Sequence, residues 1–311
     1  MRVLVTGAAG FVGSHVVRML ARQGHSVCII VRPQTSLHRI ADCLDGLDVR
    51  RTDLTDHAAV QQMVLEVKPE CAIHAAWYAV PAKYWTAPEN IDCVMMSLSL
   101  AKALAVVGCQ RFVGVGSCFE YDYDHGYLSE SLTPLKPRTL YAVSKDATRS
   151  VLESYFQGTA TGFAWTRVFY VYGPGEQEAR LVPSVALALM KGTPARCTEG
   201  VQVRDYLCVE DVASAIVAVA QSQFQGAVNV GSGEPVTVRA IVQLLGEMLG
   251  RTDLLAFGAI KTNLVDPPFL VADVDRLRNE IGWRPSFCLE EGLQHTVRWW
   301  KKNLSLVGPG L

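Results

Sequence analysis

Short apolar runs alternate with longer amphipathic runs over the first half of the chain. The apolar runs lack strict in-and-out alternation, which is typical of strands that are buried on both faces. The segments between them have helical periodicity, and several end at a glycine, for example at Gly24 and Gly108. The predicted strands cover 2–7, 26–32, 47–56, 71–77, 111–117 and 162–173, and the predicted helices cover 13–24, 57–67, 89–108 and 139–158. Strands that alternate with helices predict an α/β fold with a doubly wound parallel sheet.

The pattern loosens after residue 173. Helices are predicted at 182–192 and 289–302, with mixed strand and helix signals between them. Neither a repeat nor a low-complexity linker separates the two halves. We therefore expect the second half to form a smaller lobe woven into the first.

Composition narrows the class of protein. Half of the 311 residues are hydrophobic, which is ample for a large core. The net charge is −1, from 29 basic and 30 acidic residues, so nothing favours a nucleic-acid partner. No uninterrupted apolar stretch is long enough to span a bilayer, so no membrane partner is expected. The nine cysteines are scattered without metal-ligand spacing, so we expect no metal site, reduced thiols and a cytoplasmic location.

A glycine-rich loop follows the first predicted strand and opens the first predicted helix. It reads VTGAAGFVGSH and places glycines at positions 7, 10 and 13, with Phe11 and Val12 between the last two. Glycine permits the tight turn and lets backbone N–H groups approach a pyrophosphate at the helix N-terminus. In this strand–loop–helix context, we expect Gly7, Gly10, Phe11, Val12 and Gly13 to bind a dinucleotide.

The end of the second strand indicates which dinucleotide. An acidic residue about 20 positions beyond the glycine loop would hold the ribose of NAD. The segment SVCIIVRPQTS has Arg32 there instead, and a guanidinium can pair with a 2′-phosphate. We therefore expect a preference for NADP(H), with NAD(H) possible if Arg32 is only a solvated strand-end residue. Further cofactor contacts are expected from Asp53, Leu54, Ala75 and Ala76.

A tyrosine and a lysine lie one helical turn apart in the segment TLYAVSKDATRS. They are Tyr141 and Lys145, and Ser117 precedes them at the end of the fifth predicted strand. Ligands of parallel sheets bind at that carboxyl edge. A free tyrosine has a pKa near 10, and a lysine on the same helical face would favour the phenolate and lower that pKa. We expect Tyr141 to transfer a proton, with Ser117 holding the reacting oxygen.

These motifs resemble the extended short-chain dehydrogenase/reductases, the NAD-dependent epimerase/dehydratase group. The resemblance covers nearly the whole chain and includes TGAAGFVGSH, DLTD, SCFEYD, YAVSK, RVFYVYGPG, RDYLCVEDVASAI and LRNEIGWRP. It implies that Tyr141 is the general acid/base, that Lys145 is its partner and that Ser117 is the third member. It also implies a Rossmann-type NAD(P)-binding domain at 1–170 and 206–232, and a substrate-binding lobe at 171–205 and 233–311. Many members form homodimers through two helices per subunit, here 91–104 and the Tyr141 helix.

Departures from the family narrow the reaction. Sugar-nucleotide 4,6-dehydratases carry an Asp-Glu pair where this chain has Cys118 and Phe119, so dehydration is not expected. A reductase needs only a hydride donor and the Tyr141 proton. We therefore favour an NADP(H)-dependent reductase of a nucleotide-linked keto-sugar of the 4-keto-6-deoxyhexose type. A nucleotide-sugar epimerase with bound NAD(P) and a reductase of small carbonyl compounds, similar to the dihydroflavonol type, stay open. A cofactor-binding regulator without chemistry is disfavoured by the complete set of Ser117, Tyr141 and Lys145.

Substrate contacts are expected on both sides of the sheet edge. The resemblance weakens at Cys93 and Tyr170, where many members have Asn, and the stretch NLVDPPFLVAD offers no late phosphate-binding arginine. His74 is expected to be structural, and Trp299 and Trp300 to dock the last helix. The candidate substrate-binding residues are Tyr84, with its neighbour Trp85, Cys118, Phe119, Tyr170, Arg180 and Arg204.

Overall fold

A seven-stranded parallel sheet forms the larger part of the molecule. The computed structural model describes residues 1–261 and 267–304. The sheet has the order β11-β7-β5-β4-β1-β2-β3, and all of its pairings are parallel. Its strands are β1 (Arg2–Thr6), β2 (Ser26–Val31), β3 (Leu47–Arg51), β4 (Cys71–His74), β5 (Arg111–Ser117), β7 (Gly162–Val168) and β11 (Gly226–Val230). The prediction of a doubly wound parallel sheet is confirmed.

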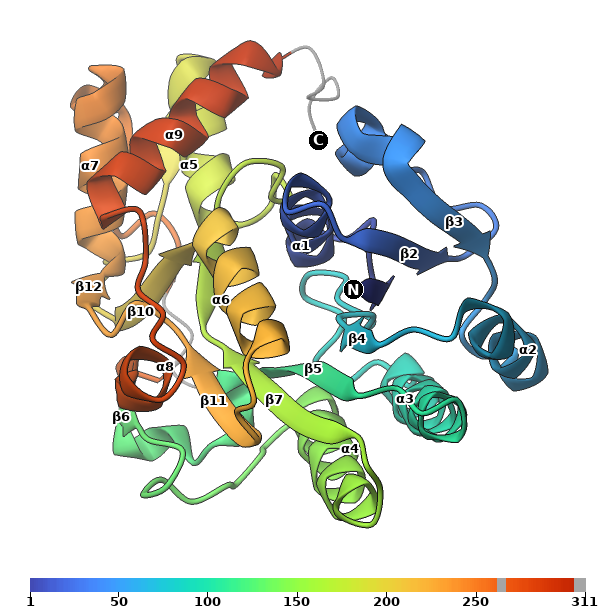
Figure 1. The fold of residues 1–311 in the computed structure, drawn as a ribbon. Coiled ribbons are helices and arrows are strands. Elements are labelled where there is room, and N and C mark those ends of the chain that lie inside the picture. The colour runs from blue at the N-terminus through green and yellow to red at the C-terminus, as the bar shows by residue number, and fades with distance from the viewer. Residues whose placement is uncertain (262–266, 305–311) are drawn as a thin grey trace.

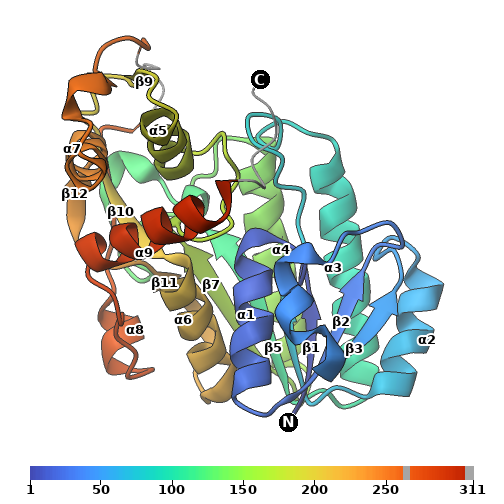
Figure 2. The same cartoon turned by 90° about the horizontal axis from the view of Figure 1, so that it is seen from above.

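Helices cover both faces of this sheet (Figures 1 and 2). One face carries α1 (Phe11–Arg22) and α6 (Val209–Gln221), and the other carries α2 (His57–Val67), α3 (Glu89–Val106) and α4 (Leu140–Gln157). Strand β1 shows why its apolar residues do not alternate with polar ones. Val3 and Val5 belong to the core under α1 and α6, whereas Leu4 belongs to the core under α2, α3 and α4.

A second, smaller lobe is built on a short mixed sheet. Its order is β12-β10-β14-β6, and β8 pairs with β10. Three helices cover it, namely α5 (Leu181–Met190), α7 (Val238–Leu249) and α9 (Leu289–Lys302). The strands are β6 (Tyr127–Leu128), β8 (Tyr170–Tyr172), β10 (Val203–Cys208), β12 (Pro235–Thr237) and β14 (Phe269–Ala272). The remaining elements are the pair β9 (Ala195–Arg196) and β13 (Leu255–Ala256), helix α8 (Asp275–Asn279) and the 3-10 turns η1 (His38–Gly46), η2 (Cys118–Glu120), η3 (Tyr123–His125) and η4 (Thr252–Leu254).

The prediction of one strand over 162–173 is wrong. The chain breaks at Phe169, whose N–H donates to the Val230 carbonyl at 3.0 Å. Strand β7 stays in the parallel sheet, whereas β8 pairs with β10 in the other sheet, with Tyr170 opposite Tyr206. One apolar run therefore supplies strands to two sheets. Strand β6 was not predicted, and it brings part of the range 1–170 into the smaller lobe.

The domain boundaries predicted from the sequence remain a proposal. We propose a cofactor domain at 1–170 and 206–232, apart from β6, which pairs in the smaller sheet, and a substrate lobe at 171–205 and 233–311. Residues 263–266, where the sequence offers no late arginine, lie outside the described residues. No helix in the described ranges has the length and apolar continuity to cross a membrane.

Candidate functional site

The glycine loop packs so closely that side chains are excluded. Gly7 has φ +70°, and a Cβ there would lie 2.6 Å from the backbone of Ala75 and Ala76. A Cβ at Gly13 would overlap the Gly7 carbonyl. Gly10 caps α1, whose first N–H groups therefore face the loop without a helical partner. This is a cradle of backbone donors at a helix N-terminus, and its residues fit the pyrophosphate of a dinucleotide.

Basic side chains gather beyond the end of β2. Arg32 is exposed, and its charge helps to lower the pKa of Asp53, after a larger effect from the Thr55 backbone hydrogen bond. Arg51, which the sequence analysis did not single out, donates to the Pro33 carbonyl at 2.7 Å and lies over the same turn. Arg39 donates to the Gly175 carbonyl at 3.1 Å. A phosphate and a ribose hydroxyl would both find partners here, because the turn holds guanidinium groups and one carboxylate.

Ser117 and Tyr141 meet at the carboxyl edge of the sheet. Ser117 ends β5, and Tyr141 lies in the first turn of α4, whose N-cap is the side chain of Thr139. A hydrogen bond with Ser117 favours the Tyr141 phenolate. The ring of Tyr141 contacts Trp77 and Tyr84 edge to face, with centroids 6.4 and 4.9 Å away. The end of β5 and the first turn of α4 thus lie side by side, which is the arrangement that the sequence predicts for Ser117 and Tyr141.

The predicted lowering of the Tyr141 pKa is wrong for this structure. Burial raises the pKa of Tyr141, and this effect outweighs the hydrogen bond from Ser117. Lys145 does not contact the phenol. Its Nζ donates to the Val115 carbonyl at 2.6 Å and lies 3.8 Å from the centre of the Trp77 ring. Burial lowers the pKa of Lys145 to about 7. Helical spacing correctly placed the two residues on one face, but desolvation decides their protonation.

An aromatic wall continues from Tyr141 into the smaller lobe. The ring centroids of Tyr84 and Trp85 lie 4.3 Å apart with the rings tilted by 34°. Edge-to-face contacts follow, with centroids 4.8 Å apart between Trp85 and Phe119 and 6.2 Å apart between Phe119 and Tyr170. A saccharide ring or an apolar ligand could pack on such faces. The wall brings together the four aromatic residues that the sequence analysis named for substrate contact.

Two predicted arginines lie against this wall. Arg180 is 5.7 Å from the centre of the Tyr84 ring and hydrogen-bonds to its hydroxyl. Arg204 lies 5.4 Å from the Tyr170 ring and is 2% exposed. Since a desolvated guanidinium binds phosphate strongly, both are suitable anion contacts.

The two positions after Ser117 differ in character. Cys118 is only 2% exposed, and burial raises the pKa of its thiol strongly. Phe119 is half-buried and joins the aromatic wall. Neither side chain can take up or release a proton near neutral pH, so Tyr141 has no second acid or base beside it at these two positions.

His74 and Cys93 serve the packing around the site. His74 bonds to Thr6 and Ser97 at 2.7 Å on either side, and burial lowers its pKa to about 3. It is a neutral structural histidine, as expected. The Cys93 sulfur accepts a hydrogen bond from the Tyr78 backbone at 3.3 Å. Trp300 is buried under α9 and Trp299 is half-buried beside it.

Two buried carboxyl groups near the site were missed by the sequence analysis. Glu120 lies directly behind Ser117, and Glu176 lies in the turn after β8. Their burial carries no signal in the sequence, because each stands in a polar stretch that reads as a loop. The only available hint was the pattern Ser-x-x-Glu at Ser117, which is a capping box.

Comparisons with known proteins agree on one family. The model of the NAD dependent epimerase/dehydratase family matches residues 3–231, well over half of the chain. UDP-glucose 4-epimerase of Mycolicibacterium smegmatis is 29% identical over 315 positions, which cover 97% of this chain and 99% of that protein. UDP-glucuronic acid decarboxylase 1 of Xenopus tropicalis is 26% identical, covering 97% of this chain and 73% of that protein. The structure of Thermus thermophilus UDP-glucose 4-epimerase in complex with NAD superposes with a TM-score of 0.84 at 28% identity, covering 97% and 99% of the two chains.

Proposed function

Because the chain belongs to the NAD-dependent epimerase/dehydratase family, whose members are extended short-chain dehydrogenase/reductase enzymes, we propose that it epimerises a nucleotide-linked sugar at C4. The proposal rests above all on one observation. Of the described residues that directly follow Ser117, neither Cys118 nor Phe119 can supply an acid or a base, so the proposal assigns proton transfer to Tyr141. Reversible oxidation at a single carbon needs one such group.

The chemistry divides between the cofactor and the side chains. NAD(P), which the glycine loop from Gly7 to Gly13 would hold, would supply reversible hydride transfer at the sugar C4. Tyr141 would take the proton of the 4-hydroxyl as the phenolate and give it back during reduction, so the positive charges of Lys145 and of an oxidised nicotinamide must offset the rise that burial causes in its pKa. Ser117 donates a hydrogen bond to the same oxygen, and Lys145 would bind the cofactor ribose and add positive charge beside the phenol. The pyrophosphate of the substrate would lie near Arg180 and Arg204.

Dehydration fits the site less well. In the dehydratases that this chain resembles, a carboxyl pair after the catalytic hydroxyl residue removes water. The buried thiol of Cys118 and the ring of Phe119 cannot replace those carboxyl groups. One relative is named as a decarboxylase and is similar over 97% of this chain. Cys118 and Phe119 therefore argue against dehydration only, because they leave Tyr141 without a second acid or base at these two positions.

The hydrogen bonds of the turn after β8 would help the protein to retain its cofactor through the reaction cycle. The Pro174 carbonyl bonds to His15 of α1 at 3.1 Å, and the Gly175 carbonyl bonds to Arg39 of η1. These bonds tie the turn to α1, which begins at the glycine loop, and to η1, which packs against α1. An epimerase needs such retention because it regenerates its cofactor in each cycle.

The decisive experiment compares net redox change with isomerisation. One portion of the purified protein is denatured, and the nicotinamide nucleotide that it releases is quantified. A second, native portion is incubated separately with UDP-glucose, UDP-N-acetylglucosamine and UDP-glucuronate, and the sugar products are identified by NMR. We expect conversion to the C4 epimer without net change in absorbance at 340 nm. If no panel member is converted, the epimerase proposal is wrong for these substrates.

A specific observation favours a second candidate, an NADP(H)-dependent keto-sugar reductase. The end of β2 has no carboxyl group and carries exposed Arg32, which suits a 2′-phosphate. Such an enzyme would consume NADPH with a nucleotide-linked 4-keto-6-deoxyhexose. Consumption of NADPH with only a small unlinked carbonyl compound would instead point to the dihydroflavonol-type alternative, for which the aromatic wall offers a surface.

We also propose a homodimer and a cytoplasmic location. Apolar side chains stand exposed along the two helices expected to pair, namely Ile91, Met95 and Val106 on α3 and Val143, Val151 and Tyr155 on α4. Burying these rows against a second copy would remove a solvent-exposed apolar surface. The nine cysteines are all free, which suits a reducing compartment.

A further inference from the structure

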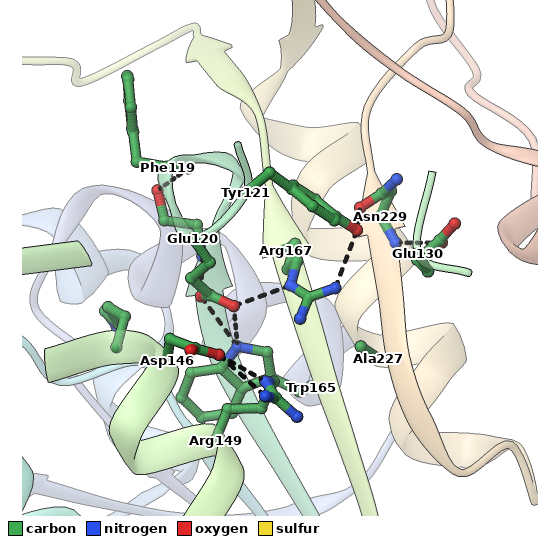
Figure 3. Close-up of polar contacts among 12 residues, drawn as sticks. Phe119, Glu120, Tyr121, Glu130, Asp146, Arg149, Trp165, Arg167, Ala227 and Asn229 are labelled. Atoms are coloured by element: carbon green, nitrogen blue, oxygen red, sulfur yellow. Dashed lines mark hydrogen bonds and ion pairs between the residues drawn. The ribbon is translucent and has the colours of Figure 1, made fainter. Parts of the chain in front are cut away.

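An ion pair with no access to solvent lies behind the catalytic serine. Glu120 of η2 is 0% exposed, and Arg167 of β7 is 2% exposed. The Arg167 Nε donates to the Glu120 Oε2 at 2.8 Å. Figure 3 shows the carboxylate between the guanidinium and the indole of Trp165, whose Nε1 donates to both carboxylate oxygens at 3.0 and 3.1 Å. The charge is thus completely enclosed by the protein.

The packing around this pair leaves no freedom. A Cβ at Gly116 would overlap the Trp165 indole and the Glu120 carboxylate. On the far side, the Arg167 Nη1 donates to the Tyr121 hydroxyl at 2.9 Å, and that hydroxyl donates to the Asn229 Oδ1 at 2.8 Å. The network therefore ties the end of β5 to β7 and β11. Such a network holds its members in one arrangement.

Stability alone does not account for the pair. Moving two charges out of water costs more than a well-packed apolar pair would, and replacing buried ion pairs by apolar residues is often neutral or stabilising. A buried pair at a catalytic edge therefore suggests another role. Its contacts with the site identify that role.

Glu120 acts directly on Ser117. The Glu120 Oε1 accepts from the Ser117 backbone N–H at 2.8 Å, and the Ser117 Oγ accepts from the Phe119 N–H at 3.3 Å. This capping box fixes the backbone of the strand end and uses one lone pair of the serine hydroxyl. The hydroxyl proton is then directed elsewhere, and Tyr141 is its neighbour in the site.

Glu120 and Lys145 of α4 lie against the same indole, because the Glu120 carboxylate accepts from the Trp165 Nε1 and the Lys145 Nζ lies 5.9 Å from the centre of the Trp165 ring. The charge of Glu120 therefore acts on Lys145. It is the largest influence that opposes the effect of burial on Lys145, and it favours the cationic ammonium. It acts on Tyr141 in the same sense, favouring the protonated phenol. The titratable and charged groups described around Glu120 and Lys145 include Arg167 on β7, Cys118 of η2 and Tyr121 directly after it, Tyr141 and the pair Asp146 and Arg149 on α4, His74 on β4 and Cys93 on α3.

We infer that Glu120, held by Arg167 and Trp165, is a positioning residue that orients Ser117 and places a buried negative charge beside Lys145. The positioning role of Glu120 rests on the proposed function, in which Ser117, Tyr141 and Lys145 form the reacting site. The charge coupling between Glu120 and Lys145 does not depend on any substrate. It can be measured whether or not the epimerase proposal is correct.

The test is a lysine titration in Glu120→Gln. This variant keeps an acceptor for the Ser117 N–H, removes the negative charge and leaves the Arg167 guanidinium in place. Protein labelled with ¹³C at lysine Cε is titrated by NMR, and Lys145 is assigned with Lys145→Arg. We expect the Lys145 pKa to fall by about one unit or more relative to the unchanged chain. The other lysines serve as internal references.

Two further variants keep the test conclusive. Glu153→Gln removes a partly exposed carboxylate of α4 that pairs with Arg149, and it should leave the Lys145 titration unchanged. Glu120→Gln combined with Arg167→Gln also removes the buried guanidinium that would otherwise lose its partner, and its Lys145 pKa should still lie below that of Arg167→Gln, because Glu120 and not Arg167 acts on Lys145. If Glu120→Gln is too unstable to titrate, the effect of the Glu120 charge is measured as the difference in Lys145 pKa between the double variant and Arg167→Gln.

The outcomes separate the two proposals. A folded Glu120→Gln protein with an unshifted Lys145 titration would overturn the inference, even if the enzyme proved to be an epimerase. A shifted titration without epimerase activity on any nucleotide sugar would support the coupling and remove only the proposed reaction. With an active substrate, we expect kcat to fall about tenfold or more with a small change in KM, because a reacting group is misplaced.

Discussion

Glu176 is a buried carboxyl group that makes stability depend on pH. It is 8% exposed, and its Oε2 has no hydrogen-bond partner among the described residues. Burial raises its pKa from 4.5 to about 8, against smaller opposing effects of Arg180 and of a hydrogen bond from the Gly173 backbone. The group is therefore protonated in the folded protein at pH 7 and ionised in the unfolded chain.

The sign of the linkage follows from proton counts. Between pH 4.5 and about 8 the folded state binds more protons at Glu176 than the unfolded state does. The free energy of unfolding therefore falls as the pH rises, by about 1.4 kcal/mol per pH unit within this window. Between pH 5.5 and 7.5 the free energy of unfolding falls by about 2.5 kcal/mol, and above the window the total loss levels off at about 5 kcal/mol.

Replacing Glu176 by Gln removes this dependence. The variant has the same shape and no titrating group, so the stability of Glu176→Gln minus that of the original chain should grow by about 2.5 kcal/mol between pH 5.5 and 7.5. Urea unfolding followed by tryptophan fluorescence at constant ionic strength measures this difference. Glu178→Gln, at an exposed position on the same turn, is the matched control. A difference that stays constant within about 0.5 kcal/mol over this range would refute the reasoning, because 1.36 kcal/mol is expected per pH unit.

Four further predictions concern the site and the assembly. Tyr141→Phe should lower kcat by about 100-fold or more and leave the amount of copurified cofactor unchanged, which separates proton transfer from binding. Arg32→Glu should weaken NADPH binding by about tenfold or more without weakening NADH, as measured by fluorescence titration, and equal affinities in the original chain would contradict the NADP(H) preference. Arg204→Gln should raise the Kd for UDP by about tenfold or more in calorimetry, and an unchanged Kd would remove Arg204 from the phosphate site. Val151→Glu should convert a dimer to a monomer in light scattering, whereas Leu132→Glu, at an 82% exposed apolar position away from α3 and α4, should not.

Local pattern was enough to predict the elements that bind the cofactor and carry the tyrosine. The glycine loop, with positive φ at Gly7, follows from residues adjacent in sequence, as does the helical spacing of Tyr141 and Lys145. Ser117 was recognised because it ends an apolar strand, and parallel strands present that end at one edge of the sheet. The geometry of the glycine loop, of the Tyr141–Lys145 spacing and of the end of β5 depends on residues that are close together in the sequence.

Pairings between distant segments were not predictable in the same way. The break between β7 and β8 depends on β10, which begins more than 30 residues later. The contact of Arg167 with Glu120 arises because β5 and β7 are neighbours in the sheet, and no local pattern announces it. The hydrogen bond from Arg180 to Tyr84 likewise joins the smaller lobe to the loop after β4.

The sequence by itself determined the fold class, the closely packed glycine loop and the placing of Tyr141 and Lys145 on one helix, because periodicity, glycine spacing and helical spacing act over short stretches of chain. Only the tertiary structure decided the protonation of the site. The pKa values of Tyr141, Lys145 and Glu176 follow burial, and burial depends on which distant segments cover each group. Desolvation of a charge is a property of the assembled environment, so residue type and spacing alone predicted the Tyr141 pKa in the wrong direction.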